Sequence, residues 1–480
     1  MAAKPVTIRN LTSTPIELRH VERFPPPEKK GGAQGLQMLA KNFTRTVTSL
    51  ATNVTRADKD AEPLPADAKP FQTKDVKVRV EPFGTVKTDI KTFVNNDKER
   101  LRLTFEVEGE RHQITVPVPT VESAEMKALK DKPRFRFTGI FVTLNSHLAI
   151  FSSARLNAWM EELRDDLLLS SLSIPGTHNT PTCHVAAPSV RCQAVSPREQ
   201  LENGVRFFDV RVQPQYPDDP GKDELILVHS AFPIALTGNK YFRELLRDIE
   251  DFLRRNPSET LILSLKREGT GKATDEQLSR ILRDHYAKPG NNWYTEPRVP
   301  TLGEVRGKIV LIRRFNLEDR LKKAHNGRGW GIDAAGWADN TPHAVCPSGD
   351  ICIQDFYEVL ETENIDKKIQ YVSEALARAA KVRYPFGRGD GKKKYPFFIN
   401  FLSASNFWKT QTWPEKIAAK VNPATVAYLC SKHGGDKESD WSTGILVTDW
   451  VGLDGDFDLF RAIVGMNARL KLRSPEKKKD

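Results

Sequence analysis

Cysteine is scarce in this chain and forms no recognisable pattern. The 480 residues include five cysteines, an odd number, and no two of them have the C-x-x-C spacing of a zinc or redox motif. They are Cys183, Cys192, Cys346, Cys352 and Cys430. Cys183 and Cys192 are close enough in sequence to pair, but no disulfide framework is indicated. The sparse usage excludes the small secreted domains that depend on disulfides or structural zinc.

Long apolar runs are also missing. None approaches the roughly 18 consecutive apolar residues of a membrane-spanning helix, and the first residues, Met1 to Pro5, lack the apolar stretch of a signal peptide. We therefore expect a cytoplasmic protein without a transmembrane segment. The Asn-x-Ser/Thr matches at Asn10, Asn42 and Asn53 then carry no glycosylation signal.

The charge balance favours anionic partners. The chain has 73 Lys and Arg against 62 Asp and Glu, a formal net charge of +11, which suits nucleic acid, acidic lipid headgroups or phosphorylated substrates. The basic runs at 392–394 and 477–479 are short, and no aromatic residues alternate with basic ones as on a base-stacking surface. We interpret the two runs as a solvated loop and tail, with attraction to an anionic membrane as the alternative. Nucleic acid is not expected as a partner, and no pattern indicates an oligomeric state.

The first 150 residues alternate apolar and polar side chains in short segments, which is typical of half-buried antiparallel strands. The segments are 6–8, 16–21, 76–80, 102–107 and 112–116, with one or two more between 137 and 150. Gly109 and its charged neighbours favour a hairpin turn. We predict a β-sandwich-like domain over 1–150 with a flexible insert near 30–70. Within the insert, 36–54 fits an amphipathic helix, packed on its own domain or on a membrane, and 56–67 fits a mobile linker.

From about residue 151 the pattern changes to strand, loop and helix in repetition. Eight strands are predicted, at 169–174, 205–212, 225–229, 260–265, 308–312, 351–356, 397–402 and 444–450. Helices with one apolar face are predicted at 241–253, 275–286, 364–382 and 458–470. This alternation favours an α/β fold, an irregular TIM-type (β/α)8 barrel over 151–473, followed by a basic tail at 474–480. Irregularity is expected at 213–224, which is short, rich in Pro and Asp, and not helical.

Ionisable residues gather where these predicted strands end. His178 and Asn179 directly follow the Pro-Gly turn that ends the first strand, and a barrel of this type has its chemistry at the C-terminal ends of its strands. The residues at the other strand ends are Asp209, Arg211, His229, Lys266, Arg313, Arg314, Asp355, Tyr357 and Asp449. Two histidines beside a guanidinium suit displacement at a phosphodiester. One imidazole removes a proton, the other donates one, and arginine stabilises the phosphoryl oxygens.

Several short motifs occur in order along this part of the chain. They are IPGTH at 174–178, GVRFFDVR at 204–211, VH at 228–229, NPSET at 256–260, SLK at 264–266, RGKIVL at 306–311, IQD at 353–355, INF at 399–401 and VTDW at 447–450. Together they resemble the X-domain core of bacterial-type phosphatidylinositol-specific phospholipase C. The resemblance covers residues 155–470 and leaves the first 150 residues unassigned.

The resemblance implies catalytic roles. His178 would be the general base for the inositol 2-hydroxyl, with Asp449 orienting it. His229 would be the general acid that protonates the departing diacylglycerol oxygen. Arg211 would bind the phosphate, and Asp209 would hold either that arginine or the second histidine. A 1,2-cyclic inositol phosphate would form first, followed by slower opening with water.

The resemblance also assigns substrate-binding residues. Lys266, Asp355 and either Arg313 or Arg314, with Arg314 preferred, would bind the inositol hydroxyls. Tyr357 would stack on the ring.

Asn179 departs from the bacterial pattern, which usually has Asp after the first histidine. Calcium-dependent eukaryotic phospholipases C have Asn there as a metal ligand. Calcium takes about six to eight oxygen ligands, whereas Arg211 and Lys266 stand where that group places further carboxylates. We therefore expect metal-independent chemistry with no cofactor and no Ca²⁺, in which Arg211 replaces the cation. The lost carboxylate removes support from the His229 acid.

Residues 405–413, after the seventh strand, place aromatic side chains beside a lysine. In the resembled family the corresponding rim loop inserts into the lipid interface, and indole rings favour that depth. Trp408 and Trp413 are therefore predicted membrane contacts. Packing on the loop's own helix is the alternative. The expected partner is an anionic phospholipid surface, with which the protein associates transiently.

Two other functions fit part of the pattern. A catalytically weak module that binds lipid or inositol phosphate would explain Asn179 and the additional β domain. A metal-dependent glycerophosphodiesterase would use a similar barrel but would need acidic metal ligands that the strand ends do not supply. Singly, Asp209, Asp449 and Tyr357 also fit structural roles, but the strand ends taken jointly favour the phospholipase.

Overall fold

The computed structural model describes residues 3–26, 64–65, 67–95, 98–117, 125–187, 189–389 and 391–473. The helix predicted at 36–54, most of the linker predicted at 56–67 and the basic tail at 474–480 lie outside these residues. The chain forms two compact units. One is Met1–Ser153 with Ala427–Lys432, and the other is Ala154–Val426 with His433–Asp480.

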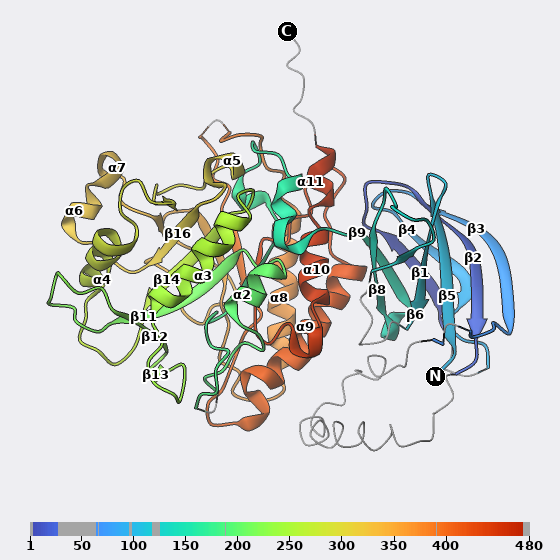
Figure 1. The fold of residues 1–480 in the computed structure, drawn as a ribbon, viewed down its shortest axis with the longest axis horizontal. Helices are drawn as coiled ribbons and strands as arrows, with labels where there is room; N and C mark the ends of the chain where they lie inside the picture. The colour runs from blue at the N-terminus through green and yellow to red at the C-terminus, as the bar shows by residue number, and fades with distance from the viewer. Residues whose placement is uncertain are drawn as a thin grey trace, which may run out of the picture. The chain divides into compact units, whose positions relative to one another are not determined.

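The first unit contains two β-sheets (Figure 1). Their orders are β4-β1-β9-β8 and β3-β2-β5-β6-β7. The strands are β1 (Pro5–Asn10), β2 (Ile16–Phe24), β3 (Gln72–Val80), β4 (Thr85–Lys91), β5 (Arg100–Val107), β6 (Glu110–Val116), β7 (Lys127–Ala128), β8 (Phe137–Val142) and β9 (His147–Ser152). Apolar side chains from both sheets form one buried core, which is the arrangement of a β-sandwich.

The pairing in this unit is mainly antiparallel, with β1 and β9 parallel. Glu108 and Gly109 both have positive φ, 46° and 84°, and form the two-residue loop between β5 and β6. Two consecutive positive φ values are those of a type I′ hairpin turn, for which glycine is well suited. Strand β4 was not predicted, because only Val86 and Ile90 supply apolar residues among its threonines and charged residues.

The second unit contains a curled, largely parallel sheet. Hydrogen-bonded neighbouring strands follow the order β15-β16-β14-β11-β10-β21-β20-β19-β18. In addition, β17 pairs with β16, and the β12–β13 hairpin pairs with β11 through β12. The strands are β10 (Ile174–Thr177), β11 (Phe207–Pro214), β12 (Leu225–His229), β13 (Phe232–Pro233), β14 (Leu261–Arg267), β15 (Trp293–Tyr294), β16 (Ile309–Arg314), β17 (Ile332–Asp333), β18 (Ala344–Val345), β19 (Ile351–Gln354), β20 (Phe397–Phe401) and β21 (Ile445–Thr448). The first predicted strand is shifted, since Leu169–Ser171 form a 3-10 turn instead.

Helices occupy the connections between these strands (Figure 1). They are α2 (Pro197–Glu202), α3 (Phe242–Arg255), α4 (Asp275–Ile281), α5 (Leu302–Val305), α6 (Asp319–Lys322), α7 (Ala324–Gly327), α8 (Asn364–Ala380), α9 (Pro414–Ser431), α10 (Asp458–Gly465) and α11 (Ala468–Leu472). Helix α9 was not predicted, and it contains Pro423, a residue that usually ends or kinks a helix. Among the described helices, none is long and apolar enough to cross a membrane.

Strand β12 corrects the predicted topology. It was expected to be the third parallel strand, but it pairs antiparallel with β11, with Val212 opposite Leu227 and Pro214 opposite Leu225. A parallel pair needs a crossover of a dozen or so residues, usually a helix. The connection at 215–224 is too short and too rich in Pro and Asp for one, so the chain turns back as a hairpin. The strand that follows β11 as a parallel neighbour is therefore β14, and β10 is its other parallel neighbour.

Side-chain alternation directs one face of each strand into the barrel. Before the C-terminal ends of the strands, the inward residues are buried and apolar. They are Ile174, Phe207, Ile262, Val310, Ile312, Ile351, Ile353, Phe397, Ile399, Phe401, Ile445 and Val447. A Cβ at Gly176 would come within 3.0–3.3 Å of Phe207 and Ile445 side-chain atoms, so a larger residue would require these neighbours to shift. Continuing the same alternation by two residues reaches the ionisable side chains at the strand ends.

A buried ion pair lies where β11 and β14 begin. Arg206 and Glu259 are both fully buried, with 2.8 Å between Arg206 Nη2 and Glu259 Oε2. The other guanidinium N–H groups donate to backbone carbonyls of Leu156, Asn157, Leu201 and Val205. Because every contact of the cation is internal, removing the carboxylate would leave an uncompensated buried charge.

We predict that Glu259→Gln destabilises the barrel unit by about 3–5 kcal/mol, because the buried Arg206 charge loses its partner. Urea unfolding followed by circular dichroism measures this loss. Asp319→Asn, which breaks the exposed Asp319–Lys322 pair, should leave the unfolding midpoint unchanged. Equal midpoints for Glu259→Gln and the parent chain would contradict the prediction.

Candidate active site

His178 lies one residue beyond β10 and pairs with a buried carboxylate. Its Nδ1 is 2.9 Å from Asp449 Oδ1, at the end of β21. Since an ionised carboxylate only accepts hydrogen bonds, Nδ1 carries the proton and Nε2 keeps a free lone pair. Burial raises the pKa of Asp449, an effect that the adjacent His178 opposes. The pair therefore places a basic nitrogen at the barrel mouth.

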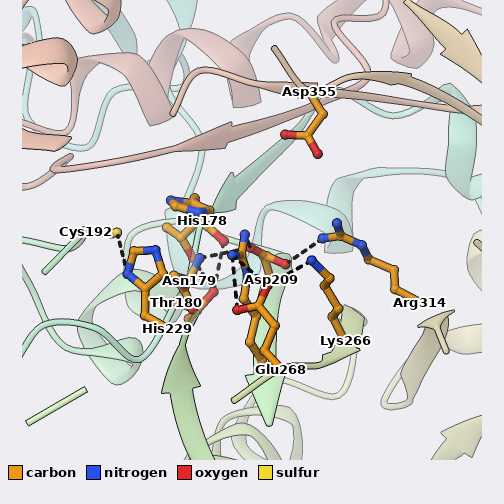
Figure 2. A network of polar contacts seen from close by, with 12 residues as sticks. His178, Asn179, Thr180, Cys192, Asp209, His229, Lys266, Glu268, Arg314 and Asp355 are labelled. Carbon is orange, nitrogen blue, oxygen red and sulfur yellow. Dashed lines mark hydrogen bonds and ion pairs between the residues drawn. The ribbon is translucent and has the colours of Figure 1, made fainter. Parts of the chain in front are cut away.

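His229 faces His178 across the site (Figure 2). The ring centroids are 5.7 Å apart and the rings are nearly perpendicular. His229 Nδ1 is 2.8 Å from the Val190 carbonyl oxygen, and it must donate there because a carbonyl only accepts. Burial, together with the charge of Arg211, lowers the pKa of His229 to about 3. In the free enzyme this imidazole is neutral at physiological pH.

Asp209 is fully buried between two guanidinium groups. Its Oδ2 accepts from Arg211 Nη2 at 3.2 Å, and its Oδ1 accepts from Arg314 Nη1 at 3.3 Å. The backbone N–H of Asn179 also donates to Oδ2, at 3.1 Å. Burial opposes ionisation, but the two arginines bring the pKa of Asp209 below its ordinary value. The structure thus places Asp209 against the arginines rather than against His229.

Glu268 is a site residue that the sequence reasoning missed. Its Oε1 accepts from Arg211 Nη1 at 3.1 Å and from Lys266 Nζ at 2.9 Å, and its Oε2 accepts from the Ser230 N–H at 2.9 Å. Although burial opposes the charge, Arg211 and Lys266 lower the pKa of Glu268. This carboxylate fixes Arg211 and Lys266 and ties both to the chain directly after His229. Strand alternation through 262, 264 and 266 would have found it.

The structure also distinguishes the two arginines of β16. Arg314 faces the site and contacts Asp209, whereas Arg313 donates to the carbonyls of Trp330 and Phe315 and pairs with Asp333. Alternation accounts for the difference, because Arg314 continues the inward set formed by 310 and 312.

A tryptophan completes the opposite side of the site. The Arg314 guanidinium lies 3.9 Å from the Trp337 ring centroid, a cation–π contact. Trp337 Nε1 donates to Asp355 Oδ2 at 2.8 Å, and Figure 2 shows the Asp355 carboxylate pointing toward the charged network. The Tyr357 hydroxyl, by contrast, donates to Asp339 Oδ2 at 2.7 Å. Trp337 was not predicted, since it lies in a long connection without a motif.

Asn179 has an unusual environment. Its φ is 42°, in the left-handed region that Asn tolerates, and its side chain is buried. Neither amide atom has a hydrogen-bond partner among the described residues. As an oxygen ligand Asn179 could contribute to a calcium site, but the neighbouring carboxylates of Asp209 and Glu268 are already held by cations. The donor set therefore does not fit Ca²⁺.

The loop that follows β20 carries an exposed aromatic group. Trp408 is 89% exposed, and its ring packs edge-on against Phe407 at 5.0 Å. Phe407 in turn stacks on Phe232 of β13 at 5.8 Å, and β13 pairs with the end of β12 next to His229. Trp413 is only half-buried, but its Nε1 donates to the Phe407 carbonyl and fixes the loop. The two tryptophans thus differ, since Trp408 is presented to solvent and Trp413 supports it.

A barrel whose strand ends bring two imidazoles and two fixed guanidinium groups together has the chemistry of a phosphodiesterase. The family described as phosphatidylinositol-specific phospholipase C, X domain, matches residues 166–315. The 1-phosphatidylinositol phosphodiesterase of Listeria monocytogenes is 30% identical over 323 residues, which cover 64% of this chain and 84% of that protein. The chain belongs to the bacterial-type phosphatidylinositol-specific phospholipase C family and is a phosphoric diester hydrolase or lyase.

Two further comparisons, with a second bacterial relative and with a solved structure, point to the same family. A 1-phosphatidylinositol phosphodiesterase of Staphylococcus aureus is 27% identical over 325 residues, covering 64% of this chain and 93% of that protein. A solved double mutant of the phosphatidylinositol-specific phospholipase C from S. aureus superposes with a TM-score of 0.52 at 25% identity, covering 67% of this chain and 98% of that chain. The predicted fold class, an irregular TIM-type barrel after a β domain, is confirmed.

We predict that Arg211→Gln raises the pKa of His229, because it removes a positive charge that disfavours the imidazolium. The pKa should stay below its ordinary value of about 6.5, since burial remains. Nitrogen-15 NMR titration of the ring nitrogens measures the change. Arg211→Lys keeps the charge and should move the pKa less, and identical titrations for the parent chain and Arg211→Gln would refute the assignment.

Proposed function

We propose that this chain cleaves phosphatidylinositol, or a related inositol phospholipid, to diacylglycerol and a 1,2-cyclic inositol phosphate. The relatives named as 1-phosphatidylinositol phosphodiesterases support the substrate. The observation that carries the proposal is the pair of facing histidines with different partners. His178 is backed by a carboxylate and His229 by a carbonyl, and Arg211 lies beside them.

The base in this reaction is His178. Its Nε2 takes the proton of the inositol 2-hydroxyl as that oxygen attacks phosphorus, and the Asp449 carboxylate stabilises the imidazolium that forms. The bond between phosphorus and the diacylglycerol oxygen then breaks, and His229 protonates the leaving oxygen. Water can later open the cyclic product. In that step His229 takes a proton from the water and His178 donates one to the inositol oxygen.

The acid role of His229 depends on the substrate. In the free enzyme the charge of Arg211 contributes to the low pKa of His229. A bound phosphodiester places one negative charge against Arg211 and offsets that contribution, so the pKa of His229 rises when substrate binds. An asparagine at 179 supplies no carboxylate to add to this effect, so the cyclic product should be opened slowly.

Catalysis is proposed to need no metal and no other cofactor. Arg211 and Arg314 are held by Asp209 at fixed positions, where they can stabilise charge on the phosphoryl oxygens without reorganisation. Lys266, Arg314 and Asp355 are proposed to bind the inositol hydroxyls. Tyr357 can stack on the ring while its hydroxyl stays on Asp339.

A second candidate function is binding without turnover. It is favoured by the buried Asn179 amide without a partner among the described residues, which stands where a carboxylate would assist the acid. This module would bind inositol phospholipid through the same arginines and release no product.

We predict that the purified chain releases cyclic inositol phosphate when it is incubated with phosphatidylinositol vesicles in the presence of EDTA. His178→Ala should lower turnover by about 10²–10⁴-fold, since it removes the base. His285→Ala changes a histidine that contacts the Pro220 carbonyl outside the site and should keep full activity. Vesicle binding without product from the parent chain would favour the binding module, and loss of activity with EDTA would refute metal independence.

The exposed group formed by Phe232, Phe407 and Trp408 is proposed to contact the phospholipid surface. These side chains are 39%, 40% and 89% exposed and belong to two connections at the mouth of the site. Indole and phenyl rings partition favourably to the headgroup region. We propose transient association with an anionic membrane from the cytoplasmic side.

We predict that Trp408→Ala weakens binding to phosphatidylinositol-containing vesicles by about tenfold or more, because an exposed indole loses its contact with lipid. Vesicle sedimentation measures the change. Leu472→Ala removes an exposed apolar side chain on α11 and should leave binding intact. Unchanged sedimentation of Trp408→Ala would show that the loop stays in water.

A further inference from the structure

Cys192 lies beside the two histidines, although the proposed reaction uses no thiol. Its Sγ is 3.8 Å from His229 Nδ1, a contact drawn in Figure 2. One ligand atom from each of His178, Cys192 and His229 lies within 4.8 Å of the other two. Among the described residues, this is the one group of three whose side chains have the spacing of a metal site.

The thiol is held in this position by its backbone. The N–H of Cys192 donates to the carbonyl and hydroxyl oxygens of Thr182 at 3.2 and 3.1 Å. The Cys192 carbonyl accepts from the Trp450 N–H at 2.9 Å, directly after Asp449. The thiol is therefore anchored to the segments that carry both His178 and its carboxylate partner, and its place does not depend on a flexible side chain.

The separations are close to those of a tetrahedral zinc site. Zinc lies about 2.3 Å from sulfur and about 2.0–2.1 Å from imidazole nitrogen, so tetrahedral ligand atoms are roughly 3.3–3.6 Å apart. Ligand atoms that are up to 4.8 Å apart would have to approach by up to about 1.5 Å, through side-chain rotations, to reach this geometry. The fourth position would remain open to water or to a phosphoryl oxygen.

The hydrogen-bond acceptors of His178 and His229 are of the kinds that metal-bound histidines use. A zinc-bound imidazole usually donates its other N–H to a carboxylate or a backbone carbonyl. His178 donates Nδ1–H to Asp449, and His229 donates Nδ1–H to the Val190 carbonyl. Both rings thus keep Nε2 free of these contacts. The contact of Cys192, however, is to Nδ1 of His229, so this ring has to turn for its Nε2 and the sulfur to share a metal.

We propose that Cys192, His178 and His229 bind a thiophilic divalent cation of the zinc type, which reversibly blocks the phosphodiesterase site. Binding releases the thiol proton to solvent, and the metal then occupies the nitrogens that the base and the acid need. A sulfur and two imidazoles select zinc over calcium or magnesium, which prefer oxygen. Arg211 opposes a cation nearby, although Asp209 and Glu268, which also pair with Arg314 and Lys266, offset part of its charge.

The test is cobalt and zinc titration of the full chain. Cobalt(II) reports a thiolate ligand through its near-ultraviolet charge-transfer absorption, and zinc should displace it. Cys192→Ser should abolish the thiolate band and weaken zinc affinity by about tenfold or more. Cys352→Ser is the matched control, because Cys352 also contacts a histidine, with its Sγ 3.6 Å from His343 Nδ1. This variant should keep the band.

The inhibition arm uses phosphatidylinositol vesicles with each variant normalised to its own activity without metal. Zinc should inhibit the parent chain and Cys352→Ser, EDTA should restore both, and Cys192→Ser should resist. If Cys192→Ser does not fold, His229→Gln tests the same site, since it removes a ligand and should weaken cobalt binding. The absence of a thiolate band in the parent chain, or its persistence in Cys192→Ser, would overturn the proposal. The cobalt measurement needs no turnover, so its outcome is independent of the proposed function.

Discussion

The site depends on the buried carboxylate of Asp209, which holds two guanidinium groups at the centre of the barrel mouth. A carboxylate without exposure is costly unless it is paired, and the arginines would repel one another without it. Glu268 repeats the arrangement on the other side of Arg211 and adds Lys266. The result is a set of cations whose positions are fixed before any substrate arrives, and such preorganised charge is the main source of transition-state stabilisation at a phosphoryl group.

The same network influences the protonation of His229. Burial and the nearby charge of Arg211 lower the pKa of this ring, whereas His178 is backed by the carboxylate of Asp449. Two imidazoles with ring centroids 5.7 Å apart therefore have different surroundings. In the proposed reaction, the negative charge of a bound phosphodiester would offset the charge of Arg211 and raise the pKa of His229, which has to be protonated to act as the acid.

Much of this arrangement could be predicted from strand alternation alone. Once Ile262 and Val310 are taken as inward, the residues that point into the mouth follow by steps of two, and this rule selects Arg314 over Arg313 and reaches Glu268. Other features could not be predicted this way. The antiparallel course of β12 depends on the length of one connection, and Trp337 reaches the site from a long segment whose path no periodicity describes.

We propose arginine-dependent rather than calcium-dependent chemistry at this mouth, and the pairing of two carboxylates with cations supports the proposal. Asp209 and Glu268 would offer oxygen ligands to a divalent ion if Arg211 and Lys266 were absent, and Asn179 would add a third. With the cations present, those oxygens are already engaged, and a hard metal would have to displace the charge-assisted hydrogen bonds from Arg211, Arg314 and Lys266. The proposed thiophilic metal would not compete for them, because Cys192, His178 and His229 offer sulfur and nitrogen instead of oxygen.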